Sequence, residues 1–170
     1  MRKAPGPLLL MLTFIACTFG LSPTVVGQSP PQGATTTKAE PWTSEQLLNA
    51  DEFARELAAT KEASRPIILY VGFRTLFLGG HIPGAEFHGT ASTEAGVASI
   101  RSWAASLPKN ANLVIYCGCC PFDKCPNIRP AFVLLRDMGF TRIRVLRLPT
   151  SFAVDWAEKN YPIEKGLRTE

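Results

Sequence analysis

Four of the five cysteines in this chain lie within nine residues of one another, in the order Cys117, Cys119, Cys120 and Cys125. A cysteine thiolate is a strong nucleophile and also a ligand for soft metal ions. The Cys-x-Cys-Cys-x₄-Cys spacing is therefore compatible with three kinds of chemistry. These are covalent sulfur chemistry at one cysteine, thiol–disulfide exchange among several, and soft-metal binding.

The segments on either side of the cysteines predict where these thiols lie. Residues 112–116 form a short, apolar, β-branched run typical of a buried strand, and residues 128–138 carry apolar side chains at helical spacing. The helix is expected to stop at Gly139. The cysteine loop then joins the carboxyl end of a strand to the amino end of a helix. Backbone N–H groups at such a place lower the pKa of a thiol and hold an anion.

Strands and helices alternate along the rest of the chain. Residues 42–59 are expected to form one helix, because Thr43 opens a capping-box-like sequence ahead of apolar residues at helical spacing. The uninterrupted apolar run at 67–71 indicates a strand covered on both faces, as in a parallel sheet. The remaining expected elements are a tight loop at 79–85, helices at 95–107 and 151–159, and a strand at 142–148. This alternation predicts a three-layer α/β fold with a largely parallel central sheet.

The amino terminus has the features of a secretory signal. Arg2 and Lys3 precede an uncharged apolar run at residues 8–19. That run is shorter than the roughly 20 residues that cross a bilayer. We expect cleavage after Gly27 and export to the periplasm or the medium. Lipid attachment at Cys17, which would be the protein's one contact with a membrane, is the alternative.

Three regions follow from this interpretation. Residues 1–27 are the signal peptide, residues 28–41 are a flexible tether rich in Pro, Thr, Gln and Ala, and residues 42–170 are the folded domain. Outside the cytoplasm thiols tend to oxidise, and the domain keeps an even number of cysteines. A disulfide such as Cys120 to Cys125 is one expected pairing.

The composition argues against several partners. The formal net charge of +4 loses two positive charges with the signal, which is too mild a balance to indicate nucleic-acid binding. No glycine-rich phosphate loop follows a strand, and so no organic cofactor is expected. We expect a monomer.

Four segments, in order along the chain, resemble the single-domain rhodaneses, a family of sulfurtransferases. Residues 80–85 read Gly-His-Ile-Pro-Gly-Ala, like the family's GHIPGA loop, and residues 114–117 resemble the strand that ends in its nucleophilic cysteine. Residues 129–140 resemble the active-site arginine and the following helix with its Met-Gly-Phe corner. Residues 156–163 resemble the terminal tryptophan and the tyrosine-proline closure. The resemblance implies a rhodanese-like α/β sandwich.

The chain departs from the family pattern in two places. The segment 70–74 reads Tyr-Val-Gly-Phe-Arg, without the acid that the family usually has there. Arg129 lies twelve positions after Cys117, in a loop that is longer than the family's and holds three additional cysteines. The family's loop geometry is therefore not carried over unchanged.

The resemblance also implies an activity. Cys117 would take the outer sulfur of a donor such as thiosulfate as a persulfide and pass it to a thiophilic acceptor. Arg129 and Lys124 would bind the anionic donor, and the backbone at Gly118 would hold the persulfide. The expected partners are a small sulfur-containing anion or a protein thiol.

Other functions remain open for the same loop. Cys119, Cys120 or Cys125 could resolve an oxidised or persulfidated Cys117, which would make the protein a thiol-redox or sulfur-relay module. The thiolates could instead bind zinc or copper(I), although adjacent cysteines do not easily bind one tetrahedral ion together. A disulfide-stapled loop in an inactive binding module is the last alternative.

Overall fold

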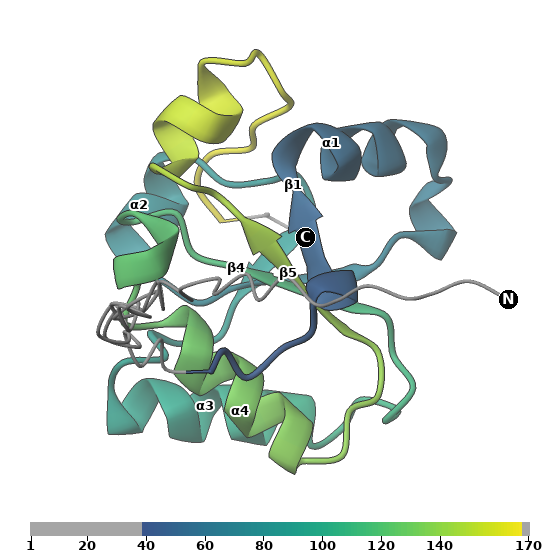
Figure 1. Ribbon diagram of the computed structural model, residues 1–170, viewed down its shortest axis with the longest axis vertical. Coiled ribbons are helices and arrows are strands. Elements are labelled where there is room, and N and C mark those ends of the chain that lie inside the picture. Colours follow the sequence, from purple (N-terminus) through teal and green to yellow (C-terminus); the bar gives the residue numbers. More distant parts are fainter. Residues whose placement is uncertain (1–38, 168–170) are drawn as a thin grey trace, which may run out of the picture. The chain divides into compact units, whose positions relative to one another are not determined.

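A five-stranded, wholly parallel sheet with helices on both faces forms the described part of the chain, residues 39–167 of the computed structural model (Figure 1). The strand order is β1-β5-β4-β2-β3. The strands are β1 (Leu47–Asn49), β2 (Ile67–Tyr70), β3 (Ala85–Phe87), β4 (Leu113–Tyr116) and β5 (Ile143–Arg147). The helices are α1 (Ala50–Ala59), α2 (Arg74–Gly79), α3 (Glu94–Ala104) and α4 (Ile128–Asp137), with short helical turns η1 (Ser44–Gln46), η2 (Glu62–Ser64), η3 (Phe122–Lys124) and η4 (Ala153–Ala157). The predicted three-layer α/β fold with a parallel sheet is confirmed.

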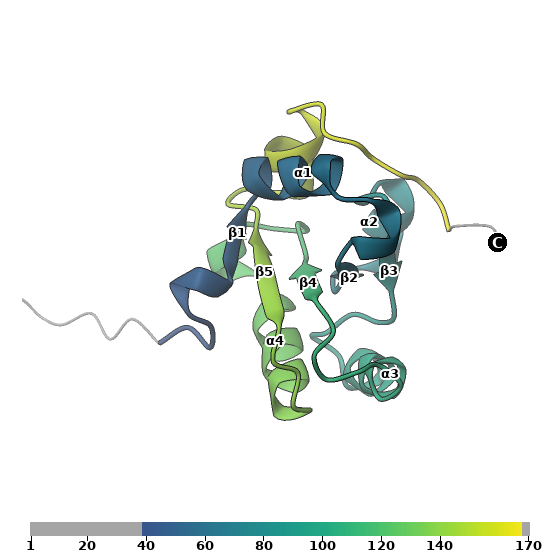
Figure 2. The same cartoon turned by 90° about the vertical axis from the view of Figure 1, so that its right-hand side faces the viewer.

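The central strand β4 contributes side chains to two separate hydrophobic cores. Leu113 and Ile115 pack in the core beneath α3 and α4, whereas Val114 and Tyr116 pack in the core beneath α1, α2 and η4 (Figure 2). This alternation follows from the two-residue period of a strand. Cys117, the next residue, falls on the side of α3 and α4.

The expected single helix at 42–59 was wrong. The capping box forms, with the N–H of Thr43 donating to Oε1 of Gln46 at 3.0 Å, but it caps only η1. Leu47–Asn49 then pairs in parallel with β5, and α1 starts afresh with Oδ1 of Asn49 accepting from the N–H of Glu52 at 2.8 Å. Two adjacent leucines are compatible with a helix and with a strand. Residues 47–49 form a strand because the edge of β5 offers them hydrogen bonds.

The predicted loop at 79–85 is flanked by two elements that were not expected, α2 and β3. Within the loop, the N–H of Ile82 donates to the hydroxyl of Tyr116 at 3.0 Å. The buried His81 ring stacks on Phe77, and its Nδ1 lies 2.8 Å from the carbonyl oxygen of Phe77. The loop is thus fastened to β4 and α2, and its histidine has a structural role.

Several predictions fall on residues that the structure does not describe. The signal peptide at 1–27, with Cys17, and most of the tether at 28–41 lie outside the described residues. Within the tether Glu40 is described, and it forms an ion pair with Arg129. No helix among residues 39–167 is long and apolar enough to cross a membrane.

The core beneath α1 provides a test of the fold. Phe53 is fully buried and packs 6.2 Å from Trp156 between ring centroids. We expect Phe53→Ala to lower the free energy of unfolding by about 3–5 kcal/mol, because the change leaves a cavity in the core. Urea denaturation measures the effect. Phe73→Ala is the matched control, since this ring is 46% exposed, and a loss as large as that at Phe53 would contradict the assignment.

Candidate active site at the cysteine loop

The cysteine loop follows β4, at the point in the sheet where the connecting helices change from one face to the other. After β2 the chain crosses to α2 on one face, and after the neighbouring β4 it crosses to α4 on the other (Figures 1 and 2). Diverging connections of this kind leave a crevice at the carboxyl ends of the strands, where ligands of α/β proteins bind. Cys117 stands at the end of β4. Gly72 lies just beyond β2, in the segment 70–74 that lacks the acid usual in rhodaneses. A Cβ atom at this position would lie 3.0 Å from the sulfur of Cys117, and so the glycine makes room for the thiol.

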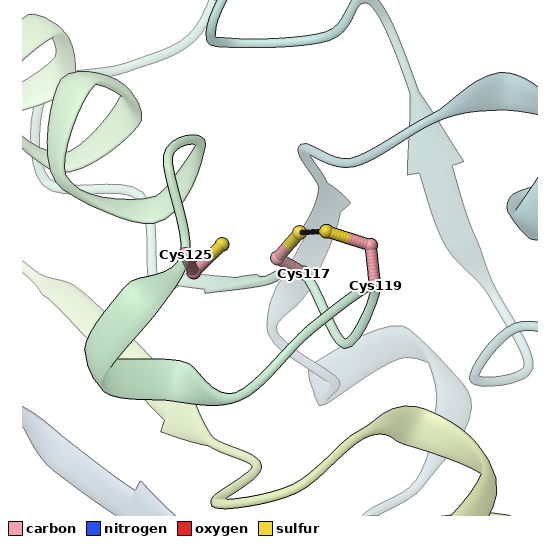
Figure 3. A group of neighbouring side chains, drawn as sticks. All are labelled: Cys117, Cys119 and Cys125. Atoms are coloured by element: carbon pink, nitrogen blue, oxygen red, sulfur yellow. Dashed lines mark hydrogen bonds between the residues drawn. The ribbon is translucent and has the colours of Figure 1, made fainter.

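Three of the four cysteines in the loop point their sulfurs toward one another (Figure 3). The Sγ atoms of Cys117, Cys119 and Cys125 all lie within 4.8 Å of each other, and those of Cys117 and Cys119 are 3.2 Å apart. We call these residues the three-thiol cluster. Cys117 and Cys125 are each 4% exposed, whereas Cys119 is half-buried. Cys120 lies outside the cluster, with its Sγ 3.3 Å from that of Cys119, and all four are free thiols.

Backbone contacts hold the long loop against the segment that follows β5. The carbonyl oxygen of Gly118 accepts from the N–H of Phe152 at 3.0 Å, and the N–H of Phe122 donates to the carbonyl oxygen of Pro149 at 3.3 Å. Gly118 has φ +91°, and a Cβ there would lie 2.8 Å from the Cβ of Phe152. Glycine is therefore required at 118 for both backbone conformation and space.

Asn127 is a site residue that sequence reasoning missed. It is fully buried, and its Nδ2 lies 3.6 Å from Sγ of Cys117 and 3.8 Å from Sγ of Cys119, both as hydrogen bonds donated to sulfur. Its Oδ1 accepts from the N–H of Ser92 at 2.9 Å. An asparagine just before a helix is normally read as a cap, but this side chain makes no capping hydrogen bond and no sequence signal marks it as a partner of the cysteines.

The negative charge of the cluster rests on Cys125. Interaction with the neighbouring thiol of Cys117, together with the backbone N–H groups of Asn127 and Ile128, lowers the pKa of Cys125 to about 5 despite its burial. The interaction with Cys125 and burial raise the pKa of Cys117 well above the usual thiol value. The pair therefore shares one proton at neutral pH, held on Cys117. Desolvation, followed by the contact with Cys119, raises the pKa of Cys120 to about 12.

Arg129 and Lys124, which were predicted to bind the anionic sulfur donor, lie in different surroundings. Arg129, in the first turn of α4, donates from Nε to Glu40 at 2.9 Å and from one terminal nitrogen to the carbonyl oxygen of Cys125 at 3.4 Å. Its guanidinium also lies over the ring of Trp42, 5.6 Å from the centroid. Lys124 is exposed at the end of η3. The arginine is thus attached to the loop beside the cluster, and its guanidinium is paired with a carboxylate.

A pocket of about 560 Å³ opens beside the cluster. Its walls include Tyr70, Gly118, Cys119, Phe152 and Lys165. Cys119 is therefore the member of the cluster that borders the pocket, and the two buried thiols lie behind it.

Comparison with known proteins identifies the fold. No protein-family model matches the chain, and no curated protein matches its sequence. The solution structure of the rhodanese-like domain of the Alr3790 protein from Anabaena sp. is similar, with 24% identity, a TM-score of 0.51, and coverage of 71% of this chain and 79% of that one. The BH2092 protein from Bacillus halodurans is similar at 18% identity, with a TM-score of 0.51 and coverage of 70% and 76%. The chain has the rhodanese-like fold that the four sequence segments implied.

The shared proton predicts an unusual titration. In the reduced, metal-free protein we expect one thiolate to be present above about pH 5 and to be lost as the pH falls through that value, because the pKa of Cys125 is lowered on folding. The ultraviolet absorbance of the thiolate, followed against pH, measures this step. Cys125→Ser should remove it. Cys120→Ser should keep it, because Cys120 does not carry the thiolate and is the smallest of the influences that lower the pKa of Cys125. An unchanged low-pH step in Cys125→Ser would contradict the assignment.

Asn127 provides a second test. Asn127→Ala removes a fully buried side chain together with its hydrogen bonds to the Ser92 N–H and to the sulfurs of Cys117 and Cys119, and we expect the free energy of unfolding to fall by about 1–3 kcal/mol. Asn110→Ala, at an exposed position, should change it by less than about 0.5 kcal/mol. Chemical denaturation of both variants measures the difference, and equal stabilities would argue against a bridging role for Asn127.

Proposed function

We propose that this domain is a sulfurtransferase that carries sulfur as a persulfide on Cys117. The observation that carries the proposal is the position of this thiol in a rhodanese-like fold, at the carboxyl end of β4 and in contact with two further sulfurs. Strand ends at such a crevice are where α/β proteins place reacting groups. The three-thiol cluster supports covalent sulfur chemistry, because neighbouring thiols can exchange protons and sulfur atoms over short distances.

The first half of the reaction starts from the thiol–thiolate pair. Cys117 passes its proton to the thiolate of Cys125, whose sulfur lies within 4.8 Å of its own, and attacks the outer sulfur of a donor such as thiosulfate. The sulfur–sulfur bond of the donor breaks, and sulfite leaves with the electron pair. A persulfide remains on Cys117, and Cys125 holds the proton.

The second half returns the site to its starting state. A thiophilic acceptor, such as cyanide or a thiolate, attacks the outer sulfur of the persulfide and takes it away. The sulfur of Cys117 leaves as a thiolate, and the proton on Cys125 returns to it. No oxidant or reductant is consumed in the cycle.

Binding of an anionic donor is assigned to Arg129, Lys124 and the backbone at Gly118. Arg129 already holds a carboxylate, that of Glu40, which supports its ability to bind an anion beside the loop. In this proposal the donor displaces Glu40 from the guanidinium. Gly118 lies between Cys117 and Cys119 and lines the pocket, and so an entering donor would pass beside it.

A second candidate function is supported by the 3.2 Å separation of the Cys117 and Cys119 sulfurs. Cys119, as a thiolate, attacks the inner sulfur of a Cys117 persulfide and forms a disulfide with it. The outer sulfur then leaves as hydrosulfide. The domain would in that case reduce sulfane sulfur and require a separate thiol to reduce the new disulfide.

The test of the proposed function is a thiosulfate-to-cyanide transfer assay. We expect Cys117→Ser to lose activity at least about a thousandfold, since the atom that carries the sulfur is gone. Cys120→Ser is the control, because Cys120 lies outside the three-thiol cluster. Intact mass after donor treatment should show one added sulfur in the control and none in Cys117→Ser. Activity undiminished in Cys117→Ser would overturn the assignment of the nucleophile.

The same samples separate the two candidates. Persulfidation that persists until acceptor is added supports transfer, and hydrosulfide release with loss of two free thiols supports the redox function. Cys119→Ser should abolish that release while leaving the persulfide in place.

A further inference from the structure

We infer that the three-thiol cluster is a binding site for copper(I). This function is separate from sulfur transfer and does not rest on it. The sulfurs of Cys117, Cys119 and Cys125 come from both ends of the loop, and Figure 3 shows them converging on one point.

The spacing of the sulfurs suits one ion bound by three thiolates. The separations run from 3.2 Å between Cys117 and Cys119 to at most 4.8 Å within the cluster. With metal–sulfur bonds of about 2.3 Å, three thiolates around one ion in a plane lie about 4 Å apart. Side-chain rotations alone therefore convert the free thiols into a ligand set, and the loop need not refold.

The donor set selects copper(I) over other ions. All members of the described cluster are sulfur, and thiolates favour copper(I), zinc and iron–sulfur clusters over harder ions. A structural zinc site almost always has four protein ligands. Cys120 does not supply the fourth, because it follows Cys119 directly and lies outside the group of mutually close sulfurs. Three close thiolates, two of them buried, match copper(I), which accepts low coordination by soft ligands.

The surroundings of the cluster are suited to holding thiolates. The Nδ2 group of Asn127 donates to the sulfurs of Cys117 and Cys119, and the backbone N–H groups before and at the start of α4 face Cys125. Such second-layer hydrogen bonds orient ligands and stabilise their charge. Cys119 borders the pocket, and so it provides a route by which copper enters through ligand exchange, one thiolate at a time.

The experiment measures copper(I) affinity of the reduced, metal-free full chain under anaerobic conditions, by competition with the chelator bicinchoninate. We expect one copper(I) per chain, with three sulfur neighbours in X-ray absorption. Cys125→Ser should weaken binding by more than about a hundredfold, since loss of a ligand exceeds the effect of losing an outer-layer partner. Cys120→Ser and Cys17→Ser are the controls and should bind within about threefold of the unaltered chain.

Circular dichroism shows whether Cys125→Ser folds. If it does not fold, a second variant tests the same proposal. Asn127→Ala retains every thiol and should weaken copper(I) binding by about 10–100-fold. Binding that no variant of the cluster weakens, an equal loss in Cys120→Ser, or four sulfurs around zinc in preference to copper would each overturn the proposal. The copper(I) measurement contains no sulfur donor, and so a failure to bind copper(I) does not contradict the sulfurtransferase proposal. A domain that binds copper(I) but transfers no sulfur would likewise not contradict the copper(I) proposal.

Discussion

The site depends on how a negative charge is accommodated in a hydrophobic core. Cys117 and Cys125 are both buried, and a lone thiolate in such a place carries a large desolvation penalty. Two features offset it: the closeness of the second thiol, which keeps its proton, and the N–H groups at the amino end of α4. One proton is retained between two sulfurs as a result. The core thus holds a single reactive charge and not two repelling ones.

The long loop between β4 and α4 brings the sulfur of Cys125 close to that of Cys117. Its short helix η3 buries Phe122, whose ring lies 5.6 Å from that of Trp42, and this contact turns the chain back toward the sheet. Cys125 follows directly and returns to Cys117 across seven intervening residues. Asn127 then connects Cys117 and Cys119, at the start of the loop, to Ser92 in the segment before α3. Phe122 and Cys125 thus place two side chains of the long loop in the core beneath α3 and α4.

The proposed sulfur transfer and the proposed copper(I) binding draw on the same physical property. A sulfur that is charged, weakly solvated and surrounded by N–H donors is a good nucleophile toward sulfur and a good ligand for a soft cation. The two uses compete for the lone pairs of Cys117. Cys119 differs from its neighbours because it alone in the three-thiol cluster borders the pocket, and a donor, an acceptor or a metal complex would meet it first.

The sequence by itself determined β4, α4 and the cysteine loop between them, because a β-branched apolar run and a helical apolar period are strong local signals. It also determined the parallel sheet and, through four segments, the rhodanese-like fold. The tertiary structure decided the rest. The three-residue strands β1 and β3 exist because β5 and β2 offer hydrogen bonds to them. Asn127, Gly72 and the location of the charge on Cys125 depend on contacts between distant segments, which no local pattern encodes.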